Sequence, residues 1–151
     1  MNWKLIVLGG LAFYVTMFVI AMATGPLLHE GILDPLYMEN SSFWRPELNQ
    51  DPPDMASLMP RWITVGLLMA FVQVALYGWI RGGFSGAPWQ KGMKYGLLLS
   101  ILGCGFMAGF SGIFNLPEKL WLWWGAEQFF YYLPGGAVLG WLGGKLAPEG
   151  A

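Results

Sequence analysis

Long uncharged stretches alternate with short charged ones along the chain, and this pattern predicts membrane-spanning helices. The stretches are residues 5–28, 62–80, 95–117 and 120–144, with one glutamate inside the last. Each is close to the roughly 20 residues that an α-helix needs to cross the hydrocarbon core. Membrane strands need only about 10 residues and alternate apolar with polar side chains, which these stretches do not. We therefore predict an all-α polytopic membrane protein with four transmembrane helices in a single domain, residues 1–151.

Proline, glycine and charge mark the ends of the predicted helices. Prolines precede three of the apolar stretches, where the missing N–H of a first-turn proline costs nothing, and glycine pairs follow two of them, as at many helix ends. The predicted helices cover approximately residues 4–27, 60–81, 89–114 and 118–144. The third and fourth are joined so closely that they should form an antiparallel hairpin. The first is too long for the 7–15 residue core of a secretory signal, so we expect it to span.

One sizeable segment, approximately residues 29–59, separates the first two helices. It contains four prolines, which exclude a long helix: Pro35, Pro46, Pro52 and Pro53. Its apolar side chains distinguish it from a disordered linker: Ile32, Leu33, Leu36, Tyr37, Met38, Phe43 and Trp44. We predict that this segment folds as a cap over the outer mouth of the bundle.

Composition agrees with a membrane environment and removes several function classes. Hydrophobic residues make up 56% of the chain and charged residues 11%, against roughly 25% charged in soluble domains. A net charge of −1 gives no basic excess, so nucleic acid is a poor partner class. Cys104 is the single cysteine, so there is no internal disulfide, and one histidine beside it makes no zinc-ligand set. We predict no cofactor and no metal, and we expect membrane lipids as partners.

Basic residues are unevenly distributed between the predicted sides of the membrane. With a cytoplasmic N-terminus, the inner side carries Lys4, Arg81, Lys91, Lys94 and Lys145, and the outer side carries Arg45, Arg61 and Lys119. The excess of Lys and Arg on the cytoplasmic side predicts a multi-pass membrane protein with both termini in the cytoplasm. The predicted outer side also carries most acids: Glu30, Asp34, Glu39, Glu47, Asp51, Asp54 and Glu118.

Glu127, inside the fourth predicted helix, is the first candidate for chemistry. A carboxylate within the membrane is costly unless it faces the bundle interior, is protonated or pairs. The functional interpretation is a proton or cation site, or a hydrogen-bond partner for a quinone-like head group. The structural interpretation is an acid bonded to another helix, for example to Tyr14, Thr16 or Gln73. Tyr131 lies one turn further along the same face.

Three more candidates lie near the outer ends of the helices. His29 and Glu30 close the first helix. A histidine can bind haem or a metal and titrates near neutrality, but without cysteine partners an interfacial hydrogen-bonding role is favoured. Arg45 has the geometry to clamp a lipid phosphate or a carboxylate, although a salt bridge to a nearby acid is favoured. His29 and Glu127 lie on the same predicted side, which leaves a shared outer site open.

Small residues recur four positions apart on three helix faces. The sets are Gly92 with Gly96, Gly105 with Gly109, and Gly136 with Gly140 and Gly144. This spacing lets helices approach closely in lipid. We expect the face of Gly136, Gly140 and Gly144 to be a docking surface for a partner subunit.

The first third of the chain contains the run Leu28-His29-Glu30-Gly31-Ile32-Leu33, then Tyr37, then Trp44-Arg45-Pro46. This pattern resembles a group of short, uncharacterised bacterial four-helix membrane proteins. In that group a histidine near the end of the first helix precedes an Ile-Leu pair, a tyrosine and a Trp-Arg-Pro, and a fourth-helix glutamate is similar to Glu127. Glu30 departs from the pattern because it separates the histidine from the glycine. The resemblance implies the four-helix architecture and carries no activity.

Two functional hypotheses follow. The chain contains no phosphate-binding loop, nucleophile elbow, HExxH or dinucleotide motif. The first hypothesis is therefore a non-catalytic accessory or structural subunit of a larger bacterial membrane complex, bound to other subunits or to itself. The alternative is a binding or carrier protein for a small molecule such as a lipid or quinone, near the outer ends of helices one and four. Its candidate residues are His29, Glu30, Arg45, Glu127 and Tyr131. A membrane enzyme that uses His29 and Glu127 is a third option.

Overall fold

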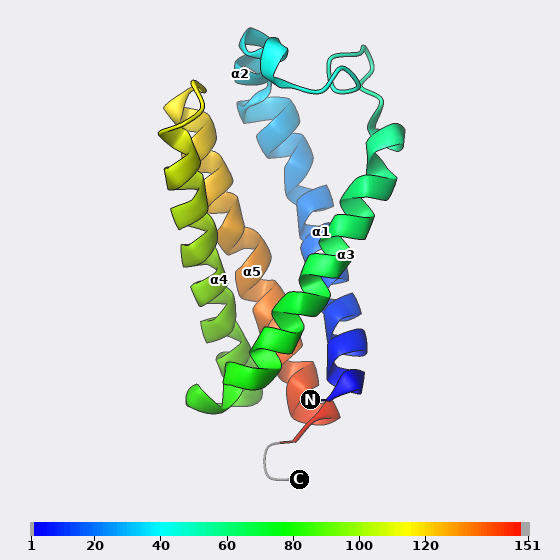
Figure 1. Cartoon of the computed structure of the whole chain (residues 1–151), viewed down its shortest axis with the longest axis vertical. Coiled ribbons are helices and arrows are strands. Elements are labelled where there is room, and N and C mark those ends of the chain that lie inside the picture. Colours follow the sequence, from blue (N-terminus) through cyan, green and yellow to red (C-terminus); the bar gives the residue numbers. More distant parts are fainter. Residues whose placement is uncertain (1, 149–151) are drawn as a thin grey trace.

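The structure is a computed structural model that describes residues 2–148, and all regular elements in this range are helices (Figure 1). The long ones are α1 (Gly10–Leu27), α3 (Met55–Ile80), α4 (Pro88–Ser111) and α5 (Glu118–Leu146). The short ones are the π turns η1 (Leu5–Gly9) and η2 (Leu28–Ile32), the helix α2 (Asp34–Glu39), and the 3-10 turns η3 (Ser41–Phe43) and η4 (Arg81–Gly83). The all-α fold class is confirmed.

Three helices of the described range are long and apolar enough to cross a membrane. They are Leu5–Ile32, Met55–Gly83 and Pro88–Ser111. This finding fits a membrane protein with several spans. The fourth long helix, α5, has 29 residues, but Glu127, Gln128 and its many tryptophans, tyrosines and glycines make it less apolar. Its crossing of the membrane stays a prediction.

The helix boundaries differ from the predicted ones in places where local chemistry overrides the sequence pattern. The first span continues through η2 instead of ending near residue 27. α3 begins five residues before Pro60, because the Asp54 carboxylate accepts the Ser57 backbone N–H at 3.2 Å and caps the helix there. α4 ends at Ser111, short of residue 114, where the Gly112 N–H turns back to a carbonyl three residues earlier.

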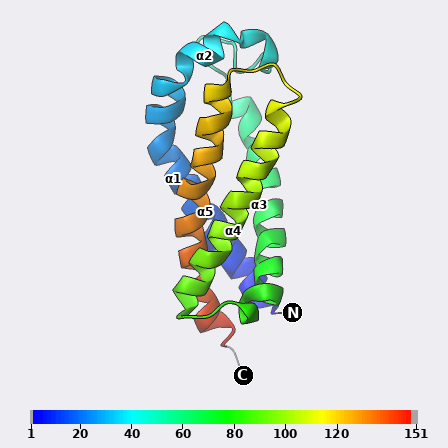
Figure 2. The same ribbon diagram turned by 90° about the vertical axis from the view of Figure 1, so that its left-hand side faces the viewer.

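α4 and α5 form the predicted antiparallel hairpin and lie side by side in both views (Figures 1 and 2). Glycines make this contact close. A Cβ atom on Gly92 would collide with the Gly136 carbonyl oxygen and lie 2.6 Å from the Gly140 Cα, and one on Gly144 would lie 2.7 Å from Pro88 Cβ. The face of Gly136, Gly140 and Gly144 is therefore occupied by α4. Our prediction that this face docks a partner is wrong, because Pro88, Gly92 and Gly96 of α4 already pack against it.

α1 packs between α5 and part of α3. We call the end that holds the start of η1, the end of α5 and η4 the terminal end, and the end that holds α2 the loop end (Figure 1). Gly66 of α3 lies against the Tyr14 ring of α1, but the preceding residues 60–65 are exposed, because α3 diverges from the other helices toward the loop end (Figure 1). Most of the core lies nearer the terminal end: Leu5, Phe13, Ala70, Val74, Tyr77, Tyr95, Leu99 and Leu139.

Charge is separated between the two ends. Within residues 2–148, the termini of the helices at the terminal end carry five basic side chains, and every Asp and Glu lies toward the loop end. The connection between α1 and α3 holds α2 and η3 at the loop end (Figure 1). This connection places Tyr37 of α2 in contact with His29, one of the predicted site residues.

Candidate functional site

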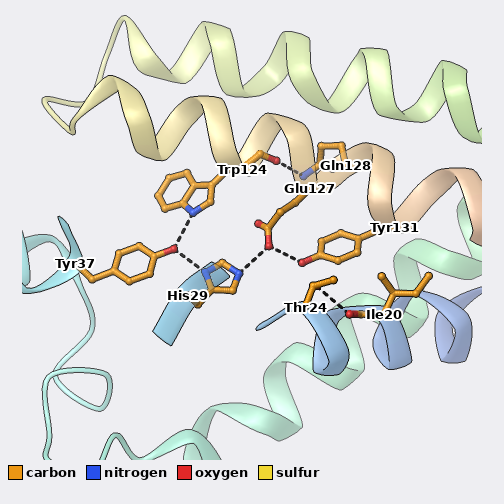
Figure 3. Close-up of polar contacts among 8 residues, drawn as sticks. All are labelled: Ile20, Thr24, His29, Tyr37, Trp124, Glu127, Gln128 and Tyr131. Carbon is orange, nitrogen blue, oxygen red and sulfur yellow. Dashed lines mark hydrogen bonds and ion pairs between the residues drawn. The ribbon is translucent and has the colours of Figure 1, made fainter. Parts of the chain in front are cut away.

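His29 lies in η2, the π turn that closes the first span. Pro26, three residues earlier, has no N–H for the helix, and the chain then continues with the wider spacing in which the Leu33 N–H donates to the Leu28 carbonyl at 2.8 Å. Both of these leucines are buried and anchor the turn. The imidazole consequently points toward α5 (Figure 3). Such π turns recur at functional sites.

Glu127 faces His29 from α5 and is 4% exposed. Its Oε1 atom lies 2.9 Å from His29 Nε2 and accepts a hydrogen bond from the Tyr131 hydroxyl at 2.8 Å (Figure 3). Both contacts use this one oxygen, and the described residues provide no hydrogen bond to Oε2. The expectation that Glu127 points into the bundle is confirmed, and Tyr131 joins it on the same helix face.

Tyr37, from α2, contacts the other side of the imidazole. Its hydroxyl lies 2.7 Å from His29 Nδ1 and accepts a hydrogen bond from Trp124 Nε1 at 3.0 Å (Figure 3). One assignment of protons satisfies all of these atoms: the Tyr37 hydroxyl donates to Nδ1, and Nε2–H donates to Glu127. Burial raises the pKa of Tyr37, the Trp124 bond opposes this shift and the Glu127 charge adds to it, so the phenol is protonated at neutral pH. We call His29, Tyr37, Trp124, Glu127 and Tyr131 the polar cluster.

Aromatic rings enclose the polar cluster at the loop end. Trp44 packs edge-on against Tyr37 with ring centres 5.3 Å apart, and its Nε1 donates to the Tyr37 carbonyl at 2.8 Å. Trp124 contacts Trp44 and, from the other side, Trp121, again edge-on at 6.1 and 5.2 Å. The cluster and these rings connect three elements that are distant in sequence: the end of the first span, α2 with η3, and α5.

No family model, no curated protein and no solved structure matches the chain. The resemblance to short four-helix bacterial membrane proteins stays a prediction.

Two of the predicted candidates lie apart from the cluster. Glu30, next to His29 in the chain, is exposed and makes no hydrogen bond or ion pair with the residues that the structure describes. Arg45 pairs with Glu47 through Nη2 and Oε1 at 2.8 Å, and the bond lowers the pKa of the Glu47 carboxyl. The salt bridge that we favoured for Arg45 is thus present, and the Arg45 guanidinium bonds to a carboxylate of the same connection.

The partners suggested for Glu127 from the sequence were wrong. Thr16 donates to the Ala12 carbonyl of its own helix at 2.7 Å, and Gln73 donates to the Tyr132 hydroxyl at 3.2 Å. Both side chains are therefore bonded elsewhere and are not partners of Glu127. Tyr37 and Trp124 were missed as polar partners. The signal available for Tyr37 was its place in the His29, Ile32-Leu33, Tyr37 and Trp44 series noted in the sequence.

The cluster can hold a proton, but its donors and acceptors mostly satisfy one another. It supplies one imidazole and one carboxylate, and no group of three His, Cys, Asp or Glu side chains suited to a metal occurs among residues 2–148. The structure contains a cavity of about 380 Å³ between α4 and α5 and another of about 230 Å³ at the terminal end. None of the cluster residues lines either cavity.

Proposed function

We propose that the chain is a four-span protein of the bacterial inner membrane and serves as a non-catalytic accessory or structural subunit of a larger membrane complex. The observation that carries this proposal is the polar cluster. Its ionisable side chains bond to one another, and neither cavity reaches them. A buried network with its donors satisfied fixes the relative position of elements. It therefore supports an architectural role for Glu127 and His29.

The proposed topology has α5 as the fourth span, the segment from Leu33 to Asp54 as an outer cap, and both termini in the cytoplasm. α5 runs antiparallel to α4 over most of its length, which supports a fourth span beside α4. The five basic residues at the terminal end support the cytoplasmic assignment. The Trp44 and Tyr37 contacts support a cap that is folded onto the bundle.

The surface proposed to meet a partner is the face of α4 that carries Gly105 and Gly109. A Cβ atom added to either glycine would meet nothing within 4 Å, so this stripe faces away from the rest of the chain. Ala108, beside it, lines the cavity of about 380 Å³ between α4 and α5. Small residues in line let a further helix approach closely in lipid. Gly105 and Gly109 have the same four-residue spacing as Gly92 and Gly96, which α4 packs against α5.

A leucine at this face tests the proposal. In the isolated chain, Gly105→Leu should leave helicity and stability unchanged, because the space is open. In native membranes, the same variant should migrate as a smaller species than wild type on extraction with a mild detergent and sizing. Ala23→Leu, on an exposed position of α1, is the matched control and should keep the larger species. A wild-type chain that extracts as a monomer, or a Gly105→Leu chain that keeps its partner, refutes this function.

The alternative, a small-molecule binding protein, is favoured by one observation. Glu127 Oε2 has no hydrogen-bond partner among the described residues, and the His29 side chain is 37% exposed. A ligand hydroxyl that reached both would bind near the outer ends of α1 and α5. Such a protein would bind a ubiquinone analogue with an affinity that falls in Glu127→Gln, whereas an accessory subunit would show no binding that depends on Glu127.

A further inference from the structure

The larger cavity is a groove between α4 and α5, in the half of the hairpin nearer the loop end. It has a volume of about 380 Å³. Its wall extends from Cys104 to Ser111 on α4 and from Glu118 to Phe129 on α5, so the groove follows the direction of both helices. Small residues leave the space open and larger apolar side chains bound it: Ala108, Gly125 and Ala126 are the small ones, and Met107, Leu122 and Phe129 the larger ones.

The length of the groove matches one leaflet of a membrane. From Glu118 to Phe129, α5 advances about 16 Å at a rise of 1.5 Å per residue. Half of the hydrocarbon core is about 15 Å thick. The groove begins where α4 ends at Ser111 and α5 begins at Glu118, and it reaches the level of Cys104 inside α4. It therefore has the direction and the depth of a lipid acyl chain.

Two polar groups near the surface end of the groove have no partner within residues 2–148. Glu118 is exposed, is the one formally charged side chain among the described lining residues, and makes no hydrogen bond or ion pair with them. Trp121 Nε1 is buried and has no hydrogen-bond partner. The Cys104 thiol and the Ser111 hydroxyl, in contrast, each donate to a backbone carbonyl, at 3.1 and 2.8 Å. The wall thus contains one acceptor and one donor that the described chain leaves unpaired.

We propose that this groove binds a membrane lipid whose head group carries a primary ammonium, as in phosphatidylethanolamine. The apolar wall contacts one acyl chain, and the ammonium donates a charge-assisted hydrogen bond to the Glu118 carboxylate. After a small tilt of its indole, Trp121 donates to an ester carbonyl. Trp121 lies about 4.5 Å deeper than Glu118 by helix rise, in the order in which the ester follows the head group. The proposal rests on the proposed four-span topology, which places both helices in lipid.

Native mass spectrometry of the isolated full chain tests the head-group contact. The wild type, extracted with equimolar phosphatidylethanolamine, phosphatidylcholine and phosphatidylglycerol, should retain one phosphatidylethanolamine in preference, because the quaternary ammonium of phosphatidylcholine has no N–H to donate. Glu118→Gln should lower this preference about five-fold, since a neutral amide is a weaker acceptor than a carboxylate. Glu39→Gln is the matched control. Glu39 is an exposed acid of α2 that does not line the groove, so its loss should leave the preference unchanged.

A second variant tests the groove itself. Ala126→Leu adds a larger side chain to the groove wall and should lower the retention of all three lipids, because less space remains for an acyl chain. Ala23→Leu, at an exposed position of α1 outside the groove, is the matched control and should retain as much lipid as wild type. Both variants should keep the circular dichroism spectrum of the wild type, which separates loss of the site from loss of the fold.

Three results would overturn the proposal. Equal retention of the three lipids by the wild type shows that the groove does not select a head group. Equal losses in Glu118→Gln and Glu39→Gln show a general attraction to the acidic end and no site. Unchanged lipid retention in Ala126→Leu places the lipid elsewhere, and if this variant also loses the larger species in native membranes, a partner helix occupies the groove. All lipid measurements use the isolated chain, so they fail or succeed separately from the Gly105→Leu test of the complex.

Discussion

Replacing Glu127 by leucine removes the acceptor on which two donors of the polar cluster depend. The Tyr131 hydroxyl and His29 Nε2 both bond to Oε1, at 2.8 and 2.9 Å. A buried donor left without an acceptor costs about 1–3 kcal/mol. Tyr131 is only half-buried and His29 is 37% exposed, so water relieves part of the cost for both. We expect Glu127→Leu to lower the free energy of unfolding by about 2–4 kcal/mol.

Glutamine at the same position separates shape from charge. Glu127→Gln keeps an acceptor oxygen near both donors and loses only the charge, which roughly doubles the strength of a hydrogen bond. The expected loss is about 1 kcal/mol. Glu30→Leu is the matched control, because Glu30 is exposed beside the same histidine; its change should stay within about 0.5 kcal/mol.

The assay is reversible unfolding in mixed micelles, followed by circular dichroism as a denaturing detergent is added. The order of loss should be leucine first, then glutamine, with the control near wild type. A Glu127→Leu chain as stable as wild type would refute the structural role of the cluster. A glutamine variant as unstable as the leucine one would show that the charge, and not the acceptor, is what the fold requires.

Three further predictions follow from the contacts described. Tyr37→Phe removes the acceptor of the Trp124 N–H and should speed amide hydrogen exchange in α2 but not in α4, and unchanged exchange in α2 contradicts the link. Gly92→Ala should destabilise by about 1–3 kcal/mol, because its Cβ meets the backbone of α5, whereas Gly105→Ala should stay within about 0.5 kcal/mol; similar effects would rule out the close contact. With the native cysteine replaced, Asn49→Cys should react with an impermeant maleimide in intact cells and Ser85→Cys should not, and the opposite pattern reverses the topology.

The helices were predictable because a chain in lipid must satisfy its backbone internally, so uncharged runs of span length become helices. Their ends were less predictable. Pro60 resembles the first-turn proline of a helix, yet the Asp54 side chain starts α3 earlier. The hairpin of α4 and α5 followed from its short connection. The spacing of the glycines predicted close helix packing, but it did not indicate that Gly92 and Gly96 of α4 would contact Gly136 and Gly140 of α5.

The site was predictable only in part. The burial of Glu127 follows from the cost of a carboxylate in lipid. Its pairing with His29 depends on the wider π turn after Pro26 and on the level at which α1 reaches α5. Tyr37 is eight residues from His29 but lies in a different helical element, α2 and not η2, so helical periodicity does not relate them. Contacts of this kind arise from tertiary packing and leave no mark in the spacing of residues.

The separation of charge between the two ends also affects how the chain enters a membrane. Residues 33–54, the proposed cap, carry five acidic and one basic side chain, a net charge of −4. In the proposed topology this segment moves to the positive side of the membrane during insertion. A potential of about 100 mV supplies about 2.3 kcal/mol for each charge, so about 9 kcal/mol of electrical work assists the transfer. The resting potential thus drives insertion in one orientation and opposes its reversal, and depolarised membranes should insert the chain more slowly.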